Sequence, residues 1–127
     1  MSVSLMHPKL DGCDPGLVAK VSRVLGAMSA LGFPMTVTDG KRSDERQKAL
    51  YAQGRSAPGP VVTHADGVTK RSKHQDGRAV DCAFLVDGKP SWASTLPWDA
   101  YGACAKAVGL RWGGDFKTLK DRPHVEL

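Results

Sequence analysis

Apolar residues recur at helical spacing in two segments of the chain. The first follows Asp14 and Pro15, an N-cap residue and a proline suited to the first helical position, and it ends at Gly32. The second extends from Pro97 to Val108 and is followed by a glycine. The pattern predicts two amphipathic core helices. Their apolar stripes consist of Leu17, Val18, Val21, Val24, Leu25, Met28 and Leu31 in the first, and of Trp98, Tyr101, Ala105 and Val108 in the second.

A more polar helix and a long loop occupy the middle of the chain. Ser43 is a suitable N-cap, and Asp44 and Glu45 fall in the first turn, where the helix dipole favours negative charge. We expect this helix to end before Gly54. From Gly54 to Lys73 the chain is polar and contains glycine and proline, which predicts a loop. Loops longer than about 12–15 residues are usually functional, so we expect this one to form a wall of a binding cleft.

Short segments with the composition of β-strands complete the pattern, at residues 35–38, 78–86, 110–112 and 124–127. Because helices and strands do not alternate regularly, we expect an α+β fold in which helices pack against a small antiparallel sheet. The longest strand has two different faces. On one face Asp81 lies between Ala79 and Ala83, so space remains around its carboxylate. The other face is expected to belong to the core and carries Val80, Cys82, Phe84 and Val86.

The composition is that of one folded domain spanning residues 1–127. Hydrophobic residues make up 41% of the 127 residues and charged residues 24%. A chain of this length buries roughly two-thirds of its unfolded surface on folding, without a disulfide framework. Its cysteines are odd in number and include no CxxC pair, which argues against a disulfide scaffold or a thiolate zinc site and favours a reducing compartment. They are Cys13, Cys82 and Cys104.

The chain is basic, with 18 lysines and arginines against 13 acidic residues and a net charge of +5. This charge favours a polyanionic partner, either nucleic acid or an anionic cell wall. The basic residues are not interleaved with aromatic residues that could stack bases. No apolar run approaches the ~20 residues of a membrane span, and the N-terminus lacks a signal peptide, so we expect synthesis in the cytosol. We expect core or cleft-wall positions, rather than a sugar platform, for Trp92, Trp98 and Trp112.

Two histidines and an aspartate form a candidate zinc site. A catalytic zinc ion uses three protein ligands, usually imidazole nitrogens and a carboxylate, and keeps one position open for water. His74 and Asp81 flank a tight turn, and His124 arrives on a separate strand. Spacing alone leaves a second interpretation open, in which His74 is a solvated loop residue, Asp81 a surface acid beside the turn and His124 an ordinary strand residue.

The order of several motifs resembles one known family. Residues 72–81 read SxHxxGxAxD, residues 113–116 read GGDF and residues 121–126 read DxPHxE. This arrangement is similar to that of the family M15 zinc peptidases, the D-alanyl-D-alanine carboxypeptidase and L-alanyl-D-glutamate endopeptidase group, which includes many phage endolysins. The resemblance extends upstream to about Met35 and implies a Hedgehog/DD-peptidase-like fold with one catalytic zinc ion. Its upstream motifs are Asp39 to Ser43, Gln47, Leu50 to Ser56, Pro58, Gly59 and Thr63.

The resemblance also implies roles for individual residues. It makes His74, Asp81 and His124 the zinc ligands, and it makes Asp121 the general base. Glu126 is a rival for the role of Asp121, because strand alternation would put it on the same face as His124. Two positions depart from the family pattern and bear on substrate fit: Lys41 replaces an aromatic residue and Phe116 a tryptophan. The residues implied to contact the substrate are Arg42, which would hold the substrate or the developing oxyanion, Ser72 and Gln47.

The function implied by the resemblance is hydrolysis of the L-alanyl-D-glutamate bond of peptidoglycan stem peptides by a phage-type endolysin. A D-alanyl-D-alanine carboxypeptidase of the same fold is the first alternative, and a basic nucleic-acid-binding module is an alternative from another class. We expect a monomer with peptidoglycan rather than nucleic acid as its partner. It would be made in the host cytoplasm and reach the wall after membrane permeabilisation, without a further wall-binding domain.

Overall fold

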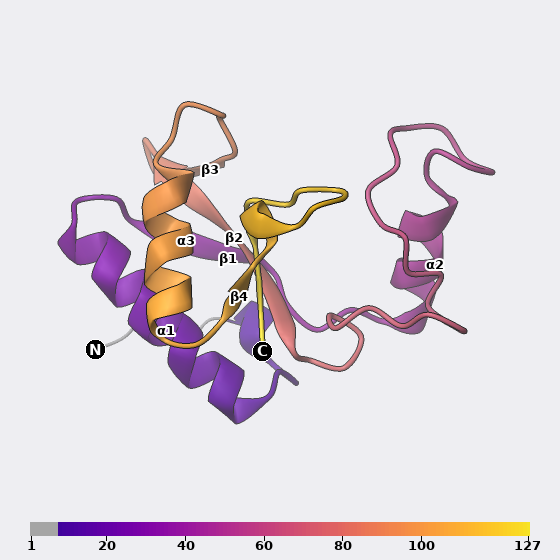
Figure 1. Cartoon of the computed structure of the whole chain (residues 1–127), viewed down its shortest axis with the longest axis horizontal. Helices are drawn as coiled ribbons and strands as arrows, with labels where there is room; N and C mark the ends of the chain where they lie inside the picture. The colour runs from indigo at the N-terminus through magenta and orange to yellow at the C-terminus, as the bar shows by residue number, and fades with distance from the viewer. Residues whose placement is uncertain (1–7) are drawn as a thin grey trace.

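The computed structural model describes residues 8–127 (Figure 1). The first seven residues, on which the expected absence of a signal peptide partly rests, lie outside the described residues. The helices are α1 (Pro15–Ala30), α2 (Asp44–Ala52) and α3 (Trp98–Ala107), with short 3-10 helices η2 (Pro8–Leu10) and η3 (Gly113–Asp115). The strands are β1 (Met35–Asp39), β2 (Ala79–Val86), β3 (Lys89–Ser91), β4 (Arg111–Trp112) and β5 (His124–Glu126).

The strands form one antiparallel sheet with the order β1-β2-β5-β4, and β3 pairs with the end of β2. Strand β2 is the centre of this arrangement, because β1, β3 and β5 all pair with it. The α+β fold with a small antiparallel sheet, expected from the irregular order of elements, is therefore confirmed. Within residues 8–127, every helix is too short or too polar to span a bilayer.

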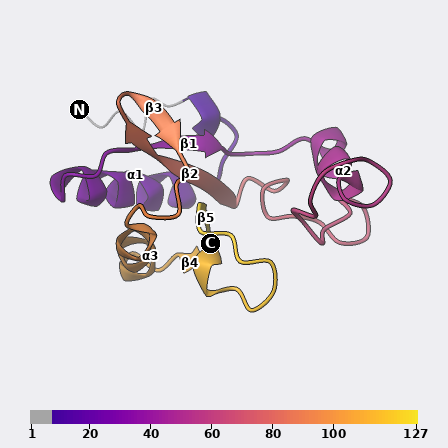
Figure 2. The same cartoon turned by 90° about the horizontal axis from the view of Figure 1, so that it is seen from above.

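The core lies where α1 and α3 meet the sheet. The two helices lie side by side in Figures 1 and 2, whereas α2 stands apart at one end of the molecule. Phe84 from β2 packs edge-to-face on Trp98 from α3, with ring centroids 4.8 Å apart. Both rings are buried, together with Tyr101. Burial of each large apolar side chain stabilises the fold by about 1.5–3 kcal/mol.

Two predicted core positions are wrong. Leu31 is 59% exposed because α1 ends at Ala30 and Leu31 serves as its C-cap. Val86 is 43% exposed because it pairs only with Lys89 in the tight turn to β3, beyond the residues of β2 that β1 covers. Trp92, expected in the core or in a cleft wall, is 54% exposed between β3 and α3, where it lines a pocket rather than the core.

The start of α1 is tied to the turn that precedes β2. Asp14 caps the helix, and its Oδ1 accepts hydrogen bonds from the N–H groups of Gly16 and Leu17 at 2.7 and 3.3 Å. Its own backbone N–H donates to the Gly77 carbonyl at 2.8 Å. Gly77 has a φ of 69°, and a Cβ there would lie 2.6 Å from the Gly12 carbonyl oxygen, so only glycine fits. The cap therefore helps to fix the position of this turn.

Replacement of Asp14 by alanine is expected to lower the free energy of unfolding by about 1 kcal/mol, because two helical N–H groups lose their acceptor. Asp14→Asn keeps an acceptor oxygen and should retain most of the stability. Urea denaturation followed by circular dichroism measures both variants. Equal losses for the alanine and asparagine variants would contradict the capping role.

Candidate metal centre

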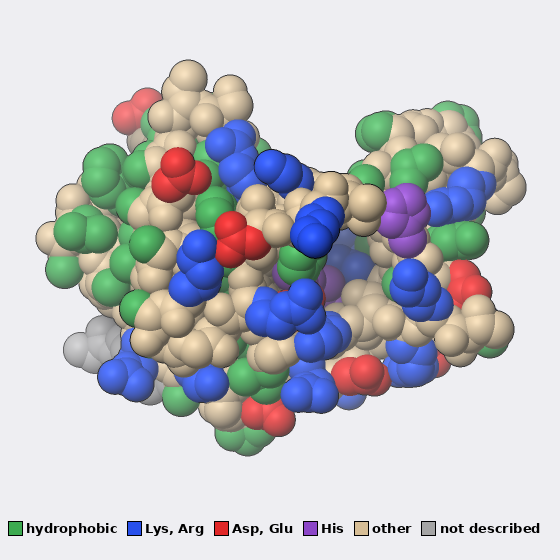
Figure 3. Space-filling view, in the orientation of Figure 1, with side chains coloured by type: hydrophobic (Ala, Val, Ile, Leu, Met, Phe, Trp, Pro, Cys, Tyr) green, Lys and Arg blue, Asp and Glu red, His purple; other side chains and the backbone are tan. Residues whose placement is uncertain are grey.

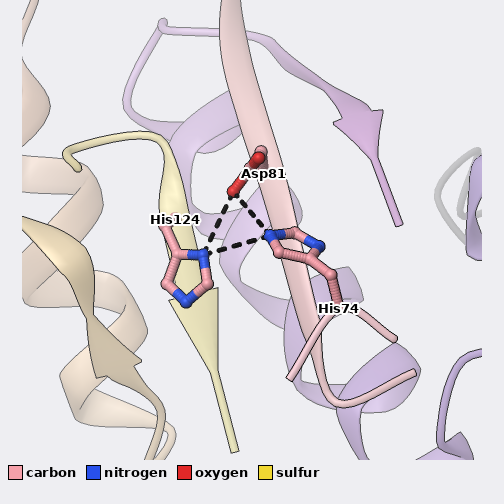
Figure 4. Close-up of side chains that lie close together, drawn as sticks. All are labelled: His74, Asp81 and His124. Atoms are coloured by element: carbon pink, nitrogen blue, oxygen red, sulfur yellow. Dashed lines mark hydrogen bonds and ion pairs between the residues drawn. The ribbon is translucent and has the colours of Figure 1, made fainter. Parts of the chain in front are cut away.

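Three side chains converge at the end of the pairing between β2 and β5 (Figure 4). Nε2 of His74 lies 3.2 Å from Nδ1 of His124. Oδ1 of Asp81 lies 3.2 Å from the first nitrogen and 3.3 Å from the second. Ligand atoms about 2.0–2.2 Å from a tetrahedral zinc ion are about 3.3–3.6 Å from one another, so this triangle has nearly the size of one face of the tetrahedron. The structure thus brings together the three residues that the sequence marked as candidate ligands.

Strand register explains how two of these residues meet. Asp81 of β2 is paired directly with His124 of β5. Residues opposite each other in an antiparallel pair have Cβ atoms about 4.5–5.5 Å apart, which suits two ligands of one ion. His74 comes from the turn that precedes β2, the same turn that Gly77 and the α1 cap hold in place. The site is therefore built from one strand pair and one anchored turn.

Outer hydrogen bonds fix which imidazole nitrogens face the centre. Nδ1 of His74 lies 2.9 Å from the Gly40 carbonyl oxygen, which can only accept, so Nδ1 carries the proton. Nε2 of His124 donates to Oε1 of Glu126 at 2.7 Å. The lone pairs of His74 Nε2 and His124 Nδ1 are therefore directed at Asp81. Such outer partners typically orient metal-binding histidines.

The Asp81 carboxylate provides a test of whether these residues fit a metal ion. Its Oδ1 is buried and has no hydrogen-bond partner among residues 8–127. A buried carboxylate oxygen without a partner is costly, and a cation between the three ligand atoms would satisfy it. The donor set of two imidazoles and one carboxylate therefore fits zinc.

Glu126 is buried and fully engaged inside the protein. Besides His124, its carboxylate contacts the Nζ of Lys73 at 3.0 Å and Nη1 of Arg111 at 3.1 Å. Although burial opposes ionisation, the hydrogen bond with His124 and the contact with Lys73 lower the pKa of Glu126 to about 2. Glu126 therefore stays ionised and serves to orient the imidazole of His124.

Asp121 lies beside the three ligand residues but remains open to solvent. Its Oδ2 is 3.9 Å from Nδ1 of His124, and its side chain is 45% exposed. Burial and then the negative charge of Asp81 raise the pKa of the Asp121 carboxyl. The backbone N–H of Asp121 donates to the Gly113 carbonyl at 2.9 Å. A Cβ at Gly113 would lie 2.1 Å from the Asp121 carbonyl oxygen, so glycine lets this loop close against β5.

Arg42 also borders the centre and lines the cleft. Its Nη2 donates to Asp39 at 2.7 Å and is 3.9 Å from the Asp81 carboxylate. Its Nη1 donates to the side-chain oxygen of Gln47 at 2.7 Å, and its backbone N–H donates to the His74 carbonyl at 2.8 Å. These bonds hold the guanidinium of Arg42 in one orientation at the cleft wall.

Gln47 and Ser72, which the resemblance placed near the substrate, have their polar groups engaged within the protein. Gln47 is fully buried, and its Nε2 donates to the Ala65 carbonyl at 2.8 Å while its oxygen accepts from Arg42. The hydroxyl of Ser72 accepts from the backbone N–H of His74 at 3.2 Å. Gln47 thus connects Arg42 to the long loop, and Ser72 supports the turn that carries His74.

The centre opens into a cleft of about 1040 Å³. The long loop between α2 and β2 contributes Val61 to Ala65 and Lys70 to Lys73 to one wall, as expected from its length, and residues 115–121 form the facing wall. Lysine and arginine side chains gather around the hollow between the body of the molecule and the lobe that carries α2 (Figure 3). A substrate with negative charge would suit this cleft.

Sequence reasoning assigned no role to two residues that support the site. Asp39 accepts from Arg42, and it falls within the motif that carried the resemblance, which was the available signal. Gln75 is buried, and its Nε2 donates to Asp44 at 3.0 Å and to the Gly67 carbonyl at 3.1 Å. No periodicity in the sequence distinguishes a buried glutamine in a turn from an exposed one.

Comparison with known proteins places the chain in a family. Residues 66–127, which include all three candidate ligands, match the family model described as D-alanyl-D-alanine carboxypeptidase. The chain is 37% identical over 105 residues to the peptidoglycan L-alanyl-D-glutamate endopeptidase CwlK of Bacillus subtilis, covering 76% of this chain and 62% of CwlK. It is 28% identical over 117 residues to the L-alanyl-D-glutamate peptidase of Listeria phage A118, covering 86% of this chain and 36% of that protein. The chain thus spans less than two-thirds of the length of these two relatives.

A solved structure agrees with the sequence comparison. The L-Ala D-Glu endopeptidase ChiX of Serratia marcescens superposes with a TM-score of 0.69 at 30% identity, covering 94% of this chain and 83% of ChiX. The chain belongs to the M15 family of peptidases, and the resemblance of its motifs to that family is confirmed.

Replacement of Glu126 by alanine is expected to weaken zinc affinity about 10- to 100-fold, because the ring of His124 loses the partner that orients it. Glu126→Gln keeps an acceptor oxygen and should stay close to the wild-type affinity. Competition with a coloured zinc chelator measures the dissociation constants of both variants. An alanine variant that binds zinc as tightly as the wild type would rule out this orienting role.

Proposed function

We propose that this protein is a zinc-dependent peptidase that hydrolyses the L-alanyl-D-glutamate bond of peptidoglycan stem peptides. The observation that carries the proposal is the triangle of His74, Asp81 and His124, which has the size and donor types of a catalytic zinc site. Support for the substrate comes from CwlK, ChiX and the Listeria phage peptidase, all of which are named for this bond.

The residues around the centre suit peptide hydrolysis. A zinc ion bound there would lower the pKa of a coordinated water towards ~7 and polarise the scissile carbonyl. Asp121 accepts the proton of the attacking water and delivers it to the leaving nitrogen, so that the amide bond breaks into an acid and an amine. The guanidinium of Arg42, held by Asp39 and Gln47, stabilises negative charge on the carbonyl oxygen or grips a substrate carboxylate.

Asp121 is favoured over Glu126 as the proton carrier because of their contacts. Glu126 is surrounded by His124, Lys73 and Arg111, so its carboxylate is not free to approach a substrate. Asp121 is nearly half exposed, faces the cleft and lies near His124. A general base needs hydrogen-bond reach to the proton that it takes, and both carboxylates line the cleft, but the side chain of Asp121 is 45% exposed and that of Glu126 only 9%.

The same proposal extends to biological role and partner. A phage-type endolysin is supported by the Listeria phage relative. In that role the protein would act as a monomer, from the host cytoplasm, once the membrane has been breached. Its net charge of +5 would favour attachment to an anionic wall and would make lysis sensitive to salt.

A D-alanyl-D-alanine carboxypeptidase is the second candidate, because the matching family model carries that description. The two activities differ in product. Digestion of purified peptidoglycan followed by mass spectrometry should show stem peptides that begin at D-glutamate. Release of single D-alanine residues, with the L-alanyl-D-glutamate bond intact, would overturn the endopeptidase assignment.

Metal removal and loss of one ligand should act alike. We expect a chelator to abolish wall digestion and added zinc to restore it. His74→Ala should abolish both zinc binding and digestion, because it removes one of the three protein ligands that hold the ion. Metal analysis and turbidity of permeabilised Gram-negative cells provide the two readouts. Full lytic activity in the His74→Ala protein would contradict the ligand assignment.

Asp121→Asn separates metal binding from chemistry. The amide cannot carry the proton, so kcat should fall about 10²- to 10⁴-fold while the zinc content stays at the wild-type value. Asp87→Asn is the matched control and should keep its turnover, because Asp87 is an exposed carboxylate in the turn between β2 and β3, outside the cleft. Unchanged turnover in Asp121→Asn would show that another residue carries the proton.

A further inference from the structure

A second pocket lies next to the catalytic cleft. It has a volume of about 660 Å³ and is lined by Trp92, by the first residues of α3 and mainly by the segment between β4 and β5. Trp92 forms part of its wall, with 54% of its surface exposed. Among residues 8–127, no hydrogen bond or ring contact engages the Trp92 indole. An exposed tryptophan beside a pocket marks a surface suited to binding a ligand.

The walls of this pocket are held rigidly. The indole N–H of Trp98 donates to the Ala93 carbonyl at 2.9 Å, which anchors the residue next to Trp92. The indole N–H of Trp112 donates to the Arg122 carbonyl at 2.8 Å. Both anchoring tryptophans are buried. The exposed face of Trp92 is therefore presented by a fixed framework, which reduces the entropy lost on binding.

The second pocket adjoins the catalytic cleft. Asp115, Lys120 and Asp121 line both. Asp121 is also the proposed proton carrier, so the second pocket shares one of its wall residues with the proposed reaction centre. A substrate bound at the centre can therefore extend into it on the Asp121 side.

The two pockets differ in chemistry. The rim of the catalytic cleft carries Arg46, Lys70, Arg71 and Lys117, which suit carboxylates. The Trp92 pocket combines an exposed aromatic face with Asp99, Asp115 and Arg122. An aromatic face packs against the C–H face of a sugar ring, while charged side chains bind hydroxyl and acetamido groups. The Trp92 pocket is thus suited to a neutral sugar and the cleft to an anionic peptide.

We propose that the Trp92 pocket binds the N-acetylated amino sugar that carries the stem peptide. This inference rests on the proposed function. The L-alanine of a stem is joined to that sugar through a lactyl group, and the residues after the scissile bond carry carboxylates. One residue spans about 3.6 Å, so the sugar of a bound substrate lies close to the centre. The substrate would run from the Trp92 pocket past Asp121 and the metal centre into the basic cleft.

Kinetics on two substrates tests this inference. One is a sugar-bearing stem peptide and the other is the same peptide without the sugar. For the wild type we expect kcat/KM to be about tenfold higher with the sugar, which corresponds to about 1.4 kcal/mol. Trp92→Ala should bring this ratio close to one, and Trp92→Phe should restore part of it. Leu31→Ala removes another exposed apolar side chain, outside both pockets, and should leave the ratio unchanged.

A binding measurement separates this inference from the proposed function. N-acetylmuramyl-L-alanine, the amino-terminal product of the proposed reaction, lacks the scissile bond. Calorimetry should show that it binds the wild-type protein about tenfold more tightly than Trp92→Ala. If the wild type cleaves neither substrate but shows this difference, the proposed function fails and the sugar site stands. If cleavage occurs and Trp92→Ala changes neither the substrate ratio nor product binding, the sugar site is overturned.

Discussion

The pairing of β5 with β2 is the constraint on which the rest of the structure depends. It sets Asp81 opposite His124, and a shift by one residue would turn either side chain to the other face of the sheet. The start of β5 is fixed by two hydrogen bonds to the Pro123 carbonyl, from the Cys82 N–H at 3.0 Å and from the Tyr101 hydroxyl at 2.8 Å. The core helix α3 therefore controls the register of a three-residue strand.

Around this pairing, hydrogen bonds restrict the freedom of each ligand residue. Gly40 accepts from His74, and a Cβ at Gly40 would lie 1.8 Å from the Lys9 carbonyl oxygen, so close backbone packing positions that acceptor. Glu126 holds His124 from the other side. Little reorganisation is then needed when a cation binds between the two imidazoles. Functional sites of this kind depend on supporting contacts as much as on the ligands themselves.

Much of this arrangement could be predicted from the sequence. The helices α1 and α3 have strong apolar periodicity, and the motif around His74 and Asp81 carries the family resemblance. The exposure of Trp92 could not be predicted, because a large aromatic residue has no local signal that distinguishes a core position from a surface one. The different surroundings of Glu126 and Asp121 could not be predicted either, because the partners of Glu126, Lys73 and Arg111, lie far from it in sequence. Pairwise contacts of this kind follow from strand register rather than from spacing.

X-ray absorption spectroscopy of the zinc-loaded protein tests the central claim most directly. The account predicts one zinc ion per chain, coordinated by two imidazole nitrogens and by oxygen atoms at about 2.0–2.2 Å. No sulfur atom should be among its ligands. In the Asp81→Ala protein the two imidazoles should remain in the spectrum of any zinc that still binds. A sulfur ligand, or a spectrum without two imidazoles in the unmodified protein, would contradict the assignment of His74, Asp81 and His124 as the metal ligands.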